Sequence, residues 1–157
     1  MSGGARTRAP NARLLVRLTL SVAALLSVPV LAPAAQLIGA SGSCADIQGG
    51  NPADGTPMIL FHCHGSPNQS WVISNGTVSG AGGVCLDVMG SAPAEGAQVI
   101  VVQCNGRPSQ KWQLTGGQIV GIGGKCLDVQ GGGADDRTPL VLKTCSAGSP
   151  SQQWSVQ

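Results

Sequence analysis

The sequence lacks tyrosine and contains a single phenylalanine, so aromatic residues make up only 3% of its 157 residues. Enzyme pockets are commonly lined with aromatic side chains, and this scarcity argues against a typical pocket-lined enzyme. Charged residues are also few, at 10%, which argues against a disordered tail and against the basic surface of a nucleic-acid-binding protein. Glycine is abundant, with 24 residues, but lacks the every-third-residue period of collagen. The length suits one domain with a short appendage.

Acidic residues are missing before Asp46, whereas four of the nine basic residues lie in the first 17 positions. Without residues 1–34 the chain has five basic and seven acidic residues, and its formal charge changes from +2 to −2. The overall basicity therefore belongs to the N-terminal segment and says nothing about the partners of the rest of the chain.

That N-terminal segment has the order of a secretory signal peptide. Its basic stretch precedes an uncharged run from Leu18 to Ala35, which contains a small-x-small end at Ala32-Pro33-Ala34. We expect residues 1–34 to be a signal peptide and residues 35–157 to form a secreted, mature domain. The alternative is a membrane anchor, since an uncharged run of this length could span a bilayer. Two prolines in the run and the A-x-A end favour removal, and no cysteine there offers a lipidation site.

Six cysteines in an exported protein indicate a disulfide framework rather than a metal site. The first cysteine of each pair recurs every 41 residues and its second cysteine follows 19 residues later. Six cysteines allow 15 pairings, and identical units select one of them: Cys44–Cys63, Cys85–Cys104 and Cys126–Cys145. Each bridge closes a short loop and is expected to stabilise the domain by about 3 kcal/mol in the loop-entropy model.

The sequence around the cysteines repeats as well. Every unit carries Cys-x-Asp-Ile/Val at its first cysteine and ends in Gln-x-Trp, and glycines stand five and two residues before that cysteine. The chain after the signal peptide is thus three units, which we call the α (36–76), β (77–117) and γ (118–157) repeats.

The local pattern predicts strands and tight turns. Apolar, β-branched runs at 58–61, 99–102 and 140–142 precede each second cysteine. Ser74-Asn75-Gly76 and Thr115-Gly116-Gly117 between short apolar runs indicate hairpins. No segment after residue 35 has helical periodicity over three turns. One such unit cannot bury its own apolar face, but three that close together can.

These repeats resemble the ricin-B-type β-trefoil lectins, and in particular the family-13 carbohydrate-binding modules of secreted bacterial glycosidases. The resemblance covers residues 36–157. It implies an all-β fold, a β-trefoil with pseudo-threefold symmetry, and up to three sugar sites, one in each repeat. It also implies that the repeated tryptophans, Trp71, Trp112 and Trp154, belong to the structural core and that the repeated glutamines act mainly as structural hydrogen-bonding residues.

A sugar site needs an aromatic face for the apolar C–H patch of the ring, and a carboxylate and amides for the hydroxyls. In the α repeat the resemblance assigns carbohydrate binding to Asp46, Phe61, His64, Asn68 and Gln69. The β repeat keeps Asp87, Asn105 and Gln110, and the γ repeat keeps Asp128 and Gln152, as weaker candidates. Their equivalents of Phe61 are Val102 and Lys143, which cannot stack well on a sugar, and Ile59 in the α repeat stands where family members often have glutamine.

Several of these residues have a structural role as the alternative to sugar binding. The repeated aspartates could hold the turn after their strand, and Phe61 could belong to the core. His62-Cys63-His64 suggests metal ligands, but Cys63 belongs to a predicted disulfide, so we expect neither a metal nor a cofactor. Asp135 and Asp136 lie in a Gly-rich loop, where adjacent carboxylates are normally solvated, and they do not form the facing pair of a glycosidase.

The sequence therefore predicts a secreted, monomeric, non-catalytic protein that binds galactose- or xylose-type sugars or polysaccharides, mainly through the α repeat. We expect carbohydrate as its partner, with no nucleic acid and no stable membrane anchor. The alternative is a β-trefoil that binds or inhibits proteins and whose sugar sites have eroded. A small hydrolase is the third hypothesis, and no nucleophile–His–acid set supports it.

Overall fold

The computed structural model describes residues 1, 3, 4 and 32–157. Residues 32–157 belong to one compact unit. The predicted signal peptide, and with it the alternative of a membrane anchor, lies largely outside the described residues and remains a prediction. Across the parts that the structure describes, no helix has the length and apolar character needed to cross a membrane.

Residues 32–157 contain twelve strands and short 3-10 helices of three residues each, as an all-β chain requires. The α repeat holds β1 (Leu37–Gly39), β2 (Cys44–Ile47), β3 (Thr56–Phe61) and β4 (Trp71–Ser74). The β repeat holds β5 (Thr77–Gly80), β6 (Val84–Val88), β7 (Val99–Gln103) and β8 (Gln113–Thr115). The γ repeat holds β9 (Gln118–Val120), β10 (Cys126–Val129), β11 (Thr138–Lys143) and β12 (Trp154–Val156). The apolar runs expected to form strands are β3, β7 and β11, each slightly longer than the run itself.

The 3-10 helices occupy three kinds of connection. Those after β2, β6 and β10 are η1 (Gln48–Gly50), η4 (Met89–Ser91) and η7 (Gln130–Gly132). Those after the second cysteines are η2 (Pro67–Gln69), η5 (Pro108–Gln110) and η8 (Pro150–Gln152), each of which begins with proline. The remaining two, η3 (Ala81–Gly83) and η6 (Ile122–Gly124), precede β6 and β10.

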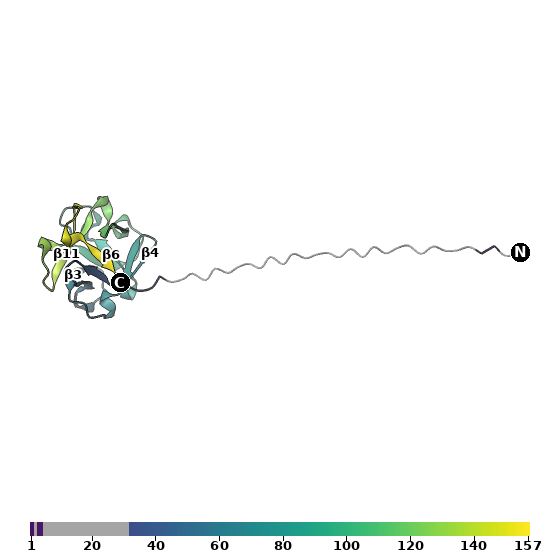
Figure 1. Cartoon of the computed structure of the whole chain (residues 1–157), viewed down its shortest axis with the longest axis horizontal. Helices are drawn as coiled ribbons and strands as arrows, with labels where there is room; N and C mark the ends of the chain where they lie inside the picture. The colour runs from purple at the N-terminus through teal and green to yellow at the C-terminus, as the bar shows by residue number, and fades with distance from the viewer. Residues whose placement is uncertain (2, 5–31) are drawn as a thin grey trace. The chain divides into compact units, whose positions relative to one another are not determined.

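The strands that precede the second cysteines, β3, β7 and β11, pair with one another in a cycle. Figure 1 labels two of them, β3 and β11. The start of β3 pairs with β7 (Thr56↔Val101), and the start of β11 pairs with β3 (Thr138↔Leu60). A bridge from Gln98, next to β7, to Val141 of β11 completes the cycle. Each repeat thus supplies one strand to its neighbour, which is the pseudo-threefold arrangement that the repeats predict.

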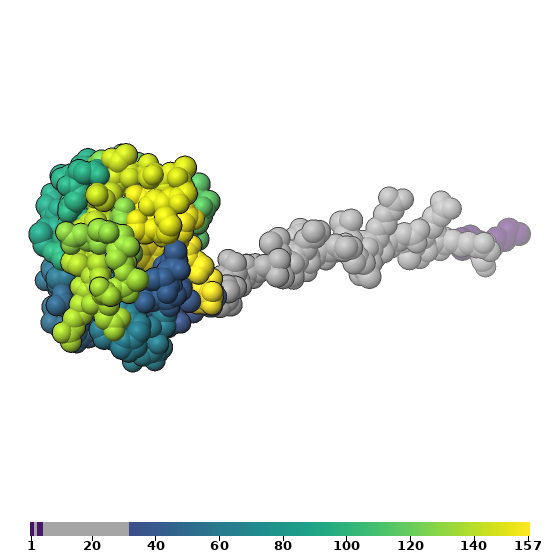
Figure 2. All heavy atoms as spheres, turned by 60° about the vertical axis from the view of Figure 1, so that its left-hand side comes forward, coloured from purple at the N-terminus to yellow at the C-terminus, as the bar shows by residue number. Residues whose placement is uncertain are grey.

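Three further strand pairs join neighbouring repeats, and two of them are hairpins. The predicted turns join β4 to β5 and β8 to β9, and Asn75 and Gly76 both have positive φ, as a two-residue primed turn requires. The third pair is made by strands from the two ends of the domain, β1 and β12, with Gly39 opposite Trp154. Figure 2 shows this closure, where the dark blue start of the described domain lies against the yellow C-terminal residues.

The repeated glycines and tryptophans form one structural unit. A side chain on Gly80 or Gly121 would meet the ring of Trp71 or Trp112, at 2.9 Å and 2.5 Å from its nearest atoms. Glycine is therefore required for Trp71 and Trp112 to pack against the opposite strand, whereas at Gly39 an added carbon would lie 3.5 Å from Trp154. The indole N–H groups donate to backbone carbonyls of β2, β6 and β10, at 3.0–3.1 Å, which satisfies the polar atom of each buried ring.

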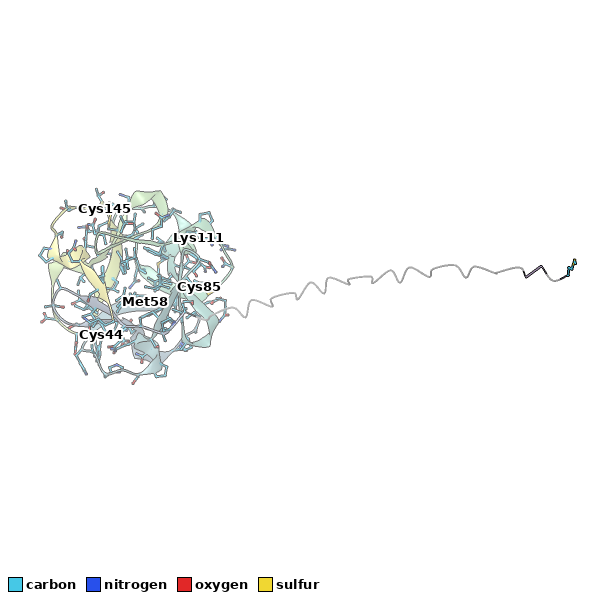
Figure 3. The ribbon with its side chains drawn as sticks, turned by 45° about the vertical axis from the view of Figure 1, so that its right-hand side comes forward. Cys44, Met58, Cys85, Lys111 and Cys145 are labelled. Atoms are coloured by element: carbon cyan, nitrogen blue, oxygen red, sulfur yellow. A yellow bond between two sulfur atoms is a disulfide. The ribbon has the colours of Figure 1, made fainter. Side chains whose placement is uncertain are left out.

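All three disulfides join the cysteines that the repeats select, with Cα–Cα distances of 5.0–5.1 Å. The core that they surround is formed by aliphatic side chains and the three tryptophans. Figure 3 shows Met58 in the interior, with Cys44, Cys85 and Cys145 on different sides of it. The pairing prediction is confirmed.

Candidate functional site

A cavity of about 450 Å³ opens in the α repeat. Four of the five predicted binding residues of that repeat line it, namely Asp46, Phe61, His64 and Asn68. Its other lining residues are Gln48, Gly49, Gly50, Ile59 and Arg137. Residues that lie up to 22 positions apart within one repeat are thus brought together with a residue of another repeat.

Strand pairing explains how the wall of this cavity forms. Asp46 of β2 lies opposite Ile59 of β3, so their side chains share a face of the sheet. Side chains alternate along a strand, so Phe61 lies on the same face as Ile59. The register of β2 against β3 therefore places the carboxylate of Asp46 on the same face as Phe61, the only phenylalanine of the chain.

Asp46 is 3% exposed, and all its hydrogen bonds within residues 32–157 end on one oxygen. Gln69 Nε2 donates to Asp46 Oδ2 at 2.8 Å, and His64 Nε2 lies 3.3 Å from the same atom. His64 Nδ1 accepts from the backbone N–H of Ser66 at 3.2 Å, so in the neutral ring the proton lies on Nε2, the nitrogen 3.3 Å from Asp46. The second oxygen, Oδ1, is left for a further donor.

Gln69, the fifth predicted residue, is fully buried and is not part of the cavity lining. Its Nε2 also donates to the carbonyl of His62 at 2.9 Å, and its Oε1 accepts the backbone N–H of His64 at 2.9 Å. Its amide therefore fixes the positions of Asp46 and of the chain after the second cysteine.

The other repeats keep the pairing of glutamine with aspartate. Gln110 donates to Asp87 at 2.9 Å and Gln152 donates to Asp128 at 2.8 Å. The surroundings of the carboxylates differ, however. Asp87 Oδ1 accepts the N–H of its own neighbour Val88 at 2.7 Å, so both oxygens of Asp87 are engaged.

Side chains around the β-repeat carboxylate also differ from those of the α cavity. Met89, which is 48% exposed, and Val102 stand in place of Gln48 and Phe61. Ser109 stands in place of Asn68, is buried, and finds no hydrogen-bond partner within residues 32–157. Asn105 occupies the position of His64 and accepts the N–H of Arg107 at 3.0 Å. The β repeat thus keeps the carboxylate without the aromatic platform.

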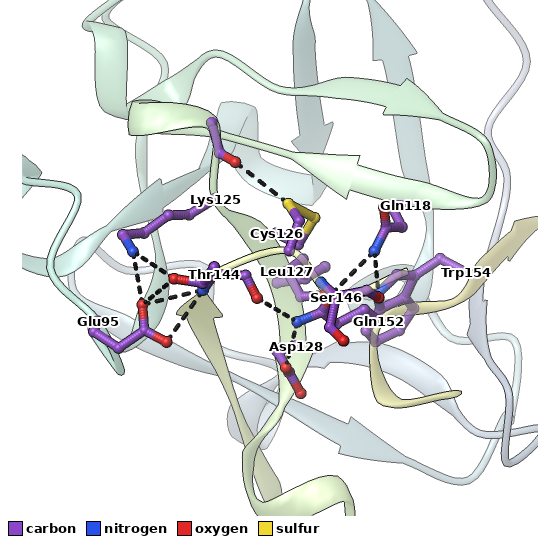
Figure 4. Close-up of a disulfide and its surroundings, with 12 residues drawn as sticks. Glu95, Gln118, Lys125, Cys126, Leu127, Asp128, Thr144, Ser146, Gln152 and Trp154 are labelled. Carbon is purple, nitrogen blue, oxygen red and sulfur yellow. Dashed lines mark hydrogen bonds and ion pairs between the residues drawn. A yellow bond between two sulfur atoms is a disulfide. The ribbon is translucent and has the colours of Figure 1, made fainter. Parts of the chain in front are cut away.

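The γ repeat has a smaller cavity, of about 270 Å³, around Asp128 (Figure 4). Lys143 stands there in place of Phe61, and Gln152 lies in the lining. At its edge Glu95 of the β repeat accepts hydrogen bonds from Lys125 at 2.7 Å and from the N–H of Thr144. The hydrogen bond from Lys125, together with that from Thr144, lowers the pKa of Glu95 to about 2.

Glu95 belongs to a second set of repeated acids that the sequence analysis missed. Asp54, Glu95 and Asp136 are also 41 residues apart, and each accepts the backbone N–H of the residue before the second cysteine in the next repeat. These N–H groups are those of Gln103, Thr144 and His62. The same 41-residue comparison that revealed the cysteines would have found these acids.

Both Asp135 and Asp136 are exposed, as expected, but Asp136 also contacts His62. Its Oδ1 accepts the N–H of His62 and its Oδ2 lies 2.7 Å from His62 Nδ1. The hydrogen bond from the His62 ring lowers the pKa of this carboxyl group. Asp136 links the γ repeat to the α repeat beside the cavity.

The two histidines next to Cys63 also contact other side chains. Cys63 is in its disulfide, and the rings of His62 and His64 contact carboxylates of different repeats. Their ring centroids lie 4.4 Å and 5.9 Å from that of Phe61. Over the described residues no group of three or more His, Cys, Asp and Glu side chains is placed to hold a metal ion.

Arg137 is the second residue that the sequence analysis missed. It lines the α cavity although it belongs to the γ repeat. The repeats offered a signal for it, because Gly55 and Gly96 occupy its position in the other two units. No feature of the α repeat alone could have indicated this neighbour.

Comparison with known proteins agrees with the fold. No curated protein matches the chain. Among solved structures, the designed threefold-symmetric protein ThreeFoil is 27% identical with a TM-score of 0.70, over 78% of this chain and 96% of that one. A non-toxic homologue of type II RIPs from Momordica charantia, in complex with α-methyl-D-galactoside, is 26% identical with a TM-score of 0.70, over 81% and 48%. An exo-β-1,3-galactanase from Clostridium thermocellum shares the fold at 23% identity and a TM-score of 0.72, over 82% of this chain and 30% of that one.

The sequence profile of the ricin-type β-trefoil lectin domain matches residues 34–154. That range includes every disulfide, all three Gln-x-Trp motifs and the α cavity. The chain therefore belongs to the ricin-type β-trefoil lectin family.

Proposed function

We propose that this protein is a secreted, non-catalytic lectin that binds galactose- or xylose-type sugars through the α cavity. The observation that carries the proposal is that Phe61 and the buried Asp46 line the same cavity. A sugar needs both an apolar face and a carboxylate acceptor, and the two come from paired strands. Secretion is supported by three disulfides, which form in oxidising compartments.

Each contact with the sugar follows from one side chain. The C–H face of the ring would pack on Phe61, and a hydroxyl would donate to the free Oδ1 of Asp46. Asn68, which is partly buried at the rim, supplies an amide for a neighbouring hydroxyl. Hydrogen bonds to an ionised carboxylate are stronger than those between neutral groups, so Asp46 is the residue on which affinity depends most.

We propose that the β and γ repeats bind sugar weakly or not at all. The β repeat has Val102 in place of the platform, and the carboxylate of Asp87 is occupied by Gln110 and Val88. The γ repeat has Lys143 in place of the platform. Binding by a single good site is monovalent, without the avidity that several linked sites provide.

The proposal contains no catalytic step because six of the seven carboxylates already accept hydrogen bonds from the protein. Three of the seven acids accept hydrogen bonds from the repeated glutamines, and three more accept backbone N–H groups of a neighbouring repeat. A glycosidase needs two acids that face each other across the scissile bond, about 5–10 Å apart. Asp135 is left alone without such a partner.

The test is a binding screen of the oxidised domain against neutral mono- and polysaccharides, followed by calorimetry on the best ligand. Asp46→Asn keeps the size of the side chain and removes its charge, and Asp87→Asn is the matched control in the β repeat. We expect Asp46→Asn to abolish measurable binding and Asp87→Asn to leave the affinity unchanged. Equal binding by Asp46→Asn and the wild-type protein would refute the proposal.

A second candidate function rests on the two repeats that lack a platform. A scaffold whose sugar sites have eroded could bind or inhibit proteins through its loops. If the wild-type protein binds no glycan at millimolar concentration but retains a secreted hydrolase or protease on an affinity column, this function replaces the lectin.

A further inference from the structure

Arg137 is the only lysine or arginine that lines the α cavity. It reaches this cavity from the γ repeat, at the position just before β11. Thr138 pairs with Leu60 and Pro139 with Ile59, so the next position along this antiparallel register sets Arg137 beside Phe61. The backbone N–H of Arg137 donates to the carbonyl of Leu60 at 2.7 Å, which fixes its place against the strand that carries the platform.

The backbone at this position does not need an arginine. Gly55 and Gly96 occupy it in the other repeats with φ of 86° and 77°, and Arg137 adopts 70°. The N–H groups of both glycines donate to the neighbouring strand at 2.8 Å in the same way. A side chain in this left-handed conformation is sterically disfavoured, so glycine would serve the fold better. The backbone therefore gives no reason for arginine here, and the reason is to be sought in the side chain, which lines the α cavity.

That side chain makes no hydrogen bond or ion pair within residues 32–157. The hydrogen bond from His62 is the main cause of the lowered pKa of Asp136, and the nearby charge of Arg137 contributes to it, but the carboxylate of Asp136 is held by two contacts with His62. Asp135 is exposed and is not part of the cavity lining. The planar guanidinium presents donors in the geometry that matches a carboxylate.

We propose that the α cavity binds a sugar that carries a carboxylate, a uronic acid, and that Arg137 is the residue that selects it. This inference rests on the proposed lectin function and names the class of sugar. The carboxylate of the ligand pairs with the Arg137 guanidinium through two parallel hydrogen bonds. The sugar hydroxyls donate hydrogen bonds to Asp46, and the sugar ring packs on Phe61.

The charges of the cavity fix the orientation of such a ligand. Asp46 repels a second negative group, so only hydroxyls are accepted at its end. Arg137 lies beside Phe61, two residues along β3 from the partner of Asp46, and attracts the carboxylate there. A neutral sugar satisfies Asp46 equally well and leaves Arg137 without a charged partner. A ligand with hydroxyls on one side and a carboxylate on the other uses both.

The test compares galacturonic and glucuronic acid with galactose and glucose by calorimetry on the oxidised domain. Arg137→Gly is the key variant, since it installs the residue of the other repeats and relieves the backbone. Arg137→Lys keeps the charge and loses the planar fork. We expect at least one uronic acid to bind about two- to fivefold tighter than its neutral counterpart, as for an exposed charge pair.

We expect Arg137→Gly to bring the affinities for the uronic acid and for its neutral counterpart to the same value, with Arg137→Lys in between. Raising the salt concentration should reduce the preference in the wild-type protein only, because exposed charges are screened. Equal affinity for acid and neutral sugars, or a preference that survives in Arg137→Gly, overturns this inference while the lectin function stands. Binding of neither class overturns both.

Discussion

Gln69 holds Asp46 from the buried side of the α cavity, with 2.8 Å between Gln69 Nε2 and Asp46 Oδ2. The same glutamine ties down the backbone on both sides of Cys63. The Gln of the Gln-x-Trp motif therefore orients the carboxylate of the proposed sugar site without lining the cavity, and Trp71, two residues later, anchors the same segment in the core.

Replacing this glutamine is expected to affect stability and binding together. Gln69→Ala removes the hydrogen bond to the buried Asp46 carboxylate, which keeps only the 3.3 Å contact with His64 Nε2, and should lower the free energy of unfolding by about 1–3 kcal/mol. It should also weaken sugar binding, because Asp46 loses its orientation. Gln110→Ala is the matched control, with a similar loss of stability and unchanged affinity. Chemical denaturation and calorimetry measure the two effects, and wild-type affinity in Gln69→Ala would contradict this role.

Phe61 is expected to supply the apolar half of the affinity. Phe61→Ala should weaken sugar binding at least about tenfold, since burying an aromatic face against a ligand stabilises the complex by more than 1 kcal/mol. Phe61→Trp should retain binding because it keeps a platform. Val102→Ala, at the same position in the β repeat, should have no effect on affinity. An unchanged affinity in Phe61→Ala would assign Phe61 to the core of its strand instead.

The glycines opposite the tryptophans should differ in their tolerance of a methyl group. In Gly121→Ala the new carbon would lie 2.5 Å from the Trp112 ring, whereas in Gly39→Ala it would lie 3.5 Å from Trp154. Overpacking against a buried ring costs about 1–3 kcal/mol, so Gly121→Ala should lower the unfolding free energy by that amount. Gly39→Ala should lower it by less than about 1 kcal/mol. Equal losses would show that the ring of Trp112 moves aside.

Glu95 is expected to make the domain less stable in acid. Its pKa is lowered from 4.5 to about 2 by Lys125 and Thr144, so the folded state favours its ionised form. This contribution is complete above pH 4.5 and is lost as the pH falls from 4.5 toward 2. Glu95→Gln should therefore lose less stability than the wild-type protein between pH 6 and pH 2.5, measured by denaturant unfolding. Parallel pH curves for the two proteins would argue against this coupling.

Arg137→Gly is expected to raise the unfolding free energy by about 1 kcal/mol, because a left-handed backbone disfavours every residue except glycine. The reverse change, Gly96→Arg, should lower it by a similar amount. Both are measured by denaturant unfolding at neutral pH. Loss of stability in Arg137→Gly would mean that its side chain supports the fold, and that glycine does not serve this position better.

The sequence by itself determined the architecture of this protein. A 41-residue period in the cysteines, the Cys-x-Asp motif and the Gln-x-Trp motif selected the disulfides, the all-β fold and the threefold repeat. Each of these features is local or repeated, so comparing the chain with itself reveals it. The family resemblance of these motifs assigned Asp46, Phe61, His64 and Asn68 to one site. They line one cavity because they lie on two paired strands and on the segment that follows them.

Only the tertiary structure decided what the neighbouring repeats add. Arg137 enters the α cavity, and Asp136 contacts His62, across the boundary between the γ and α repeats. Both contacts arise because β3, β7 and β11 pair in a cycle, which sets the start of β11 against β3. Such contacts depend on how three units close in space, and no motif within one unit carries that information.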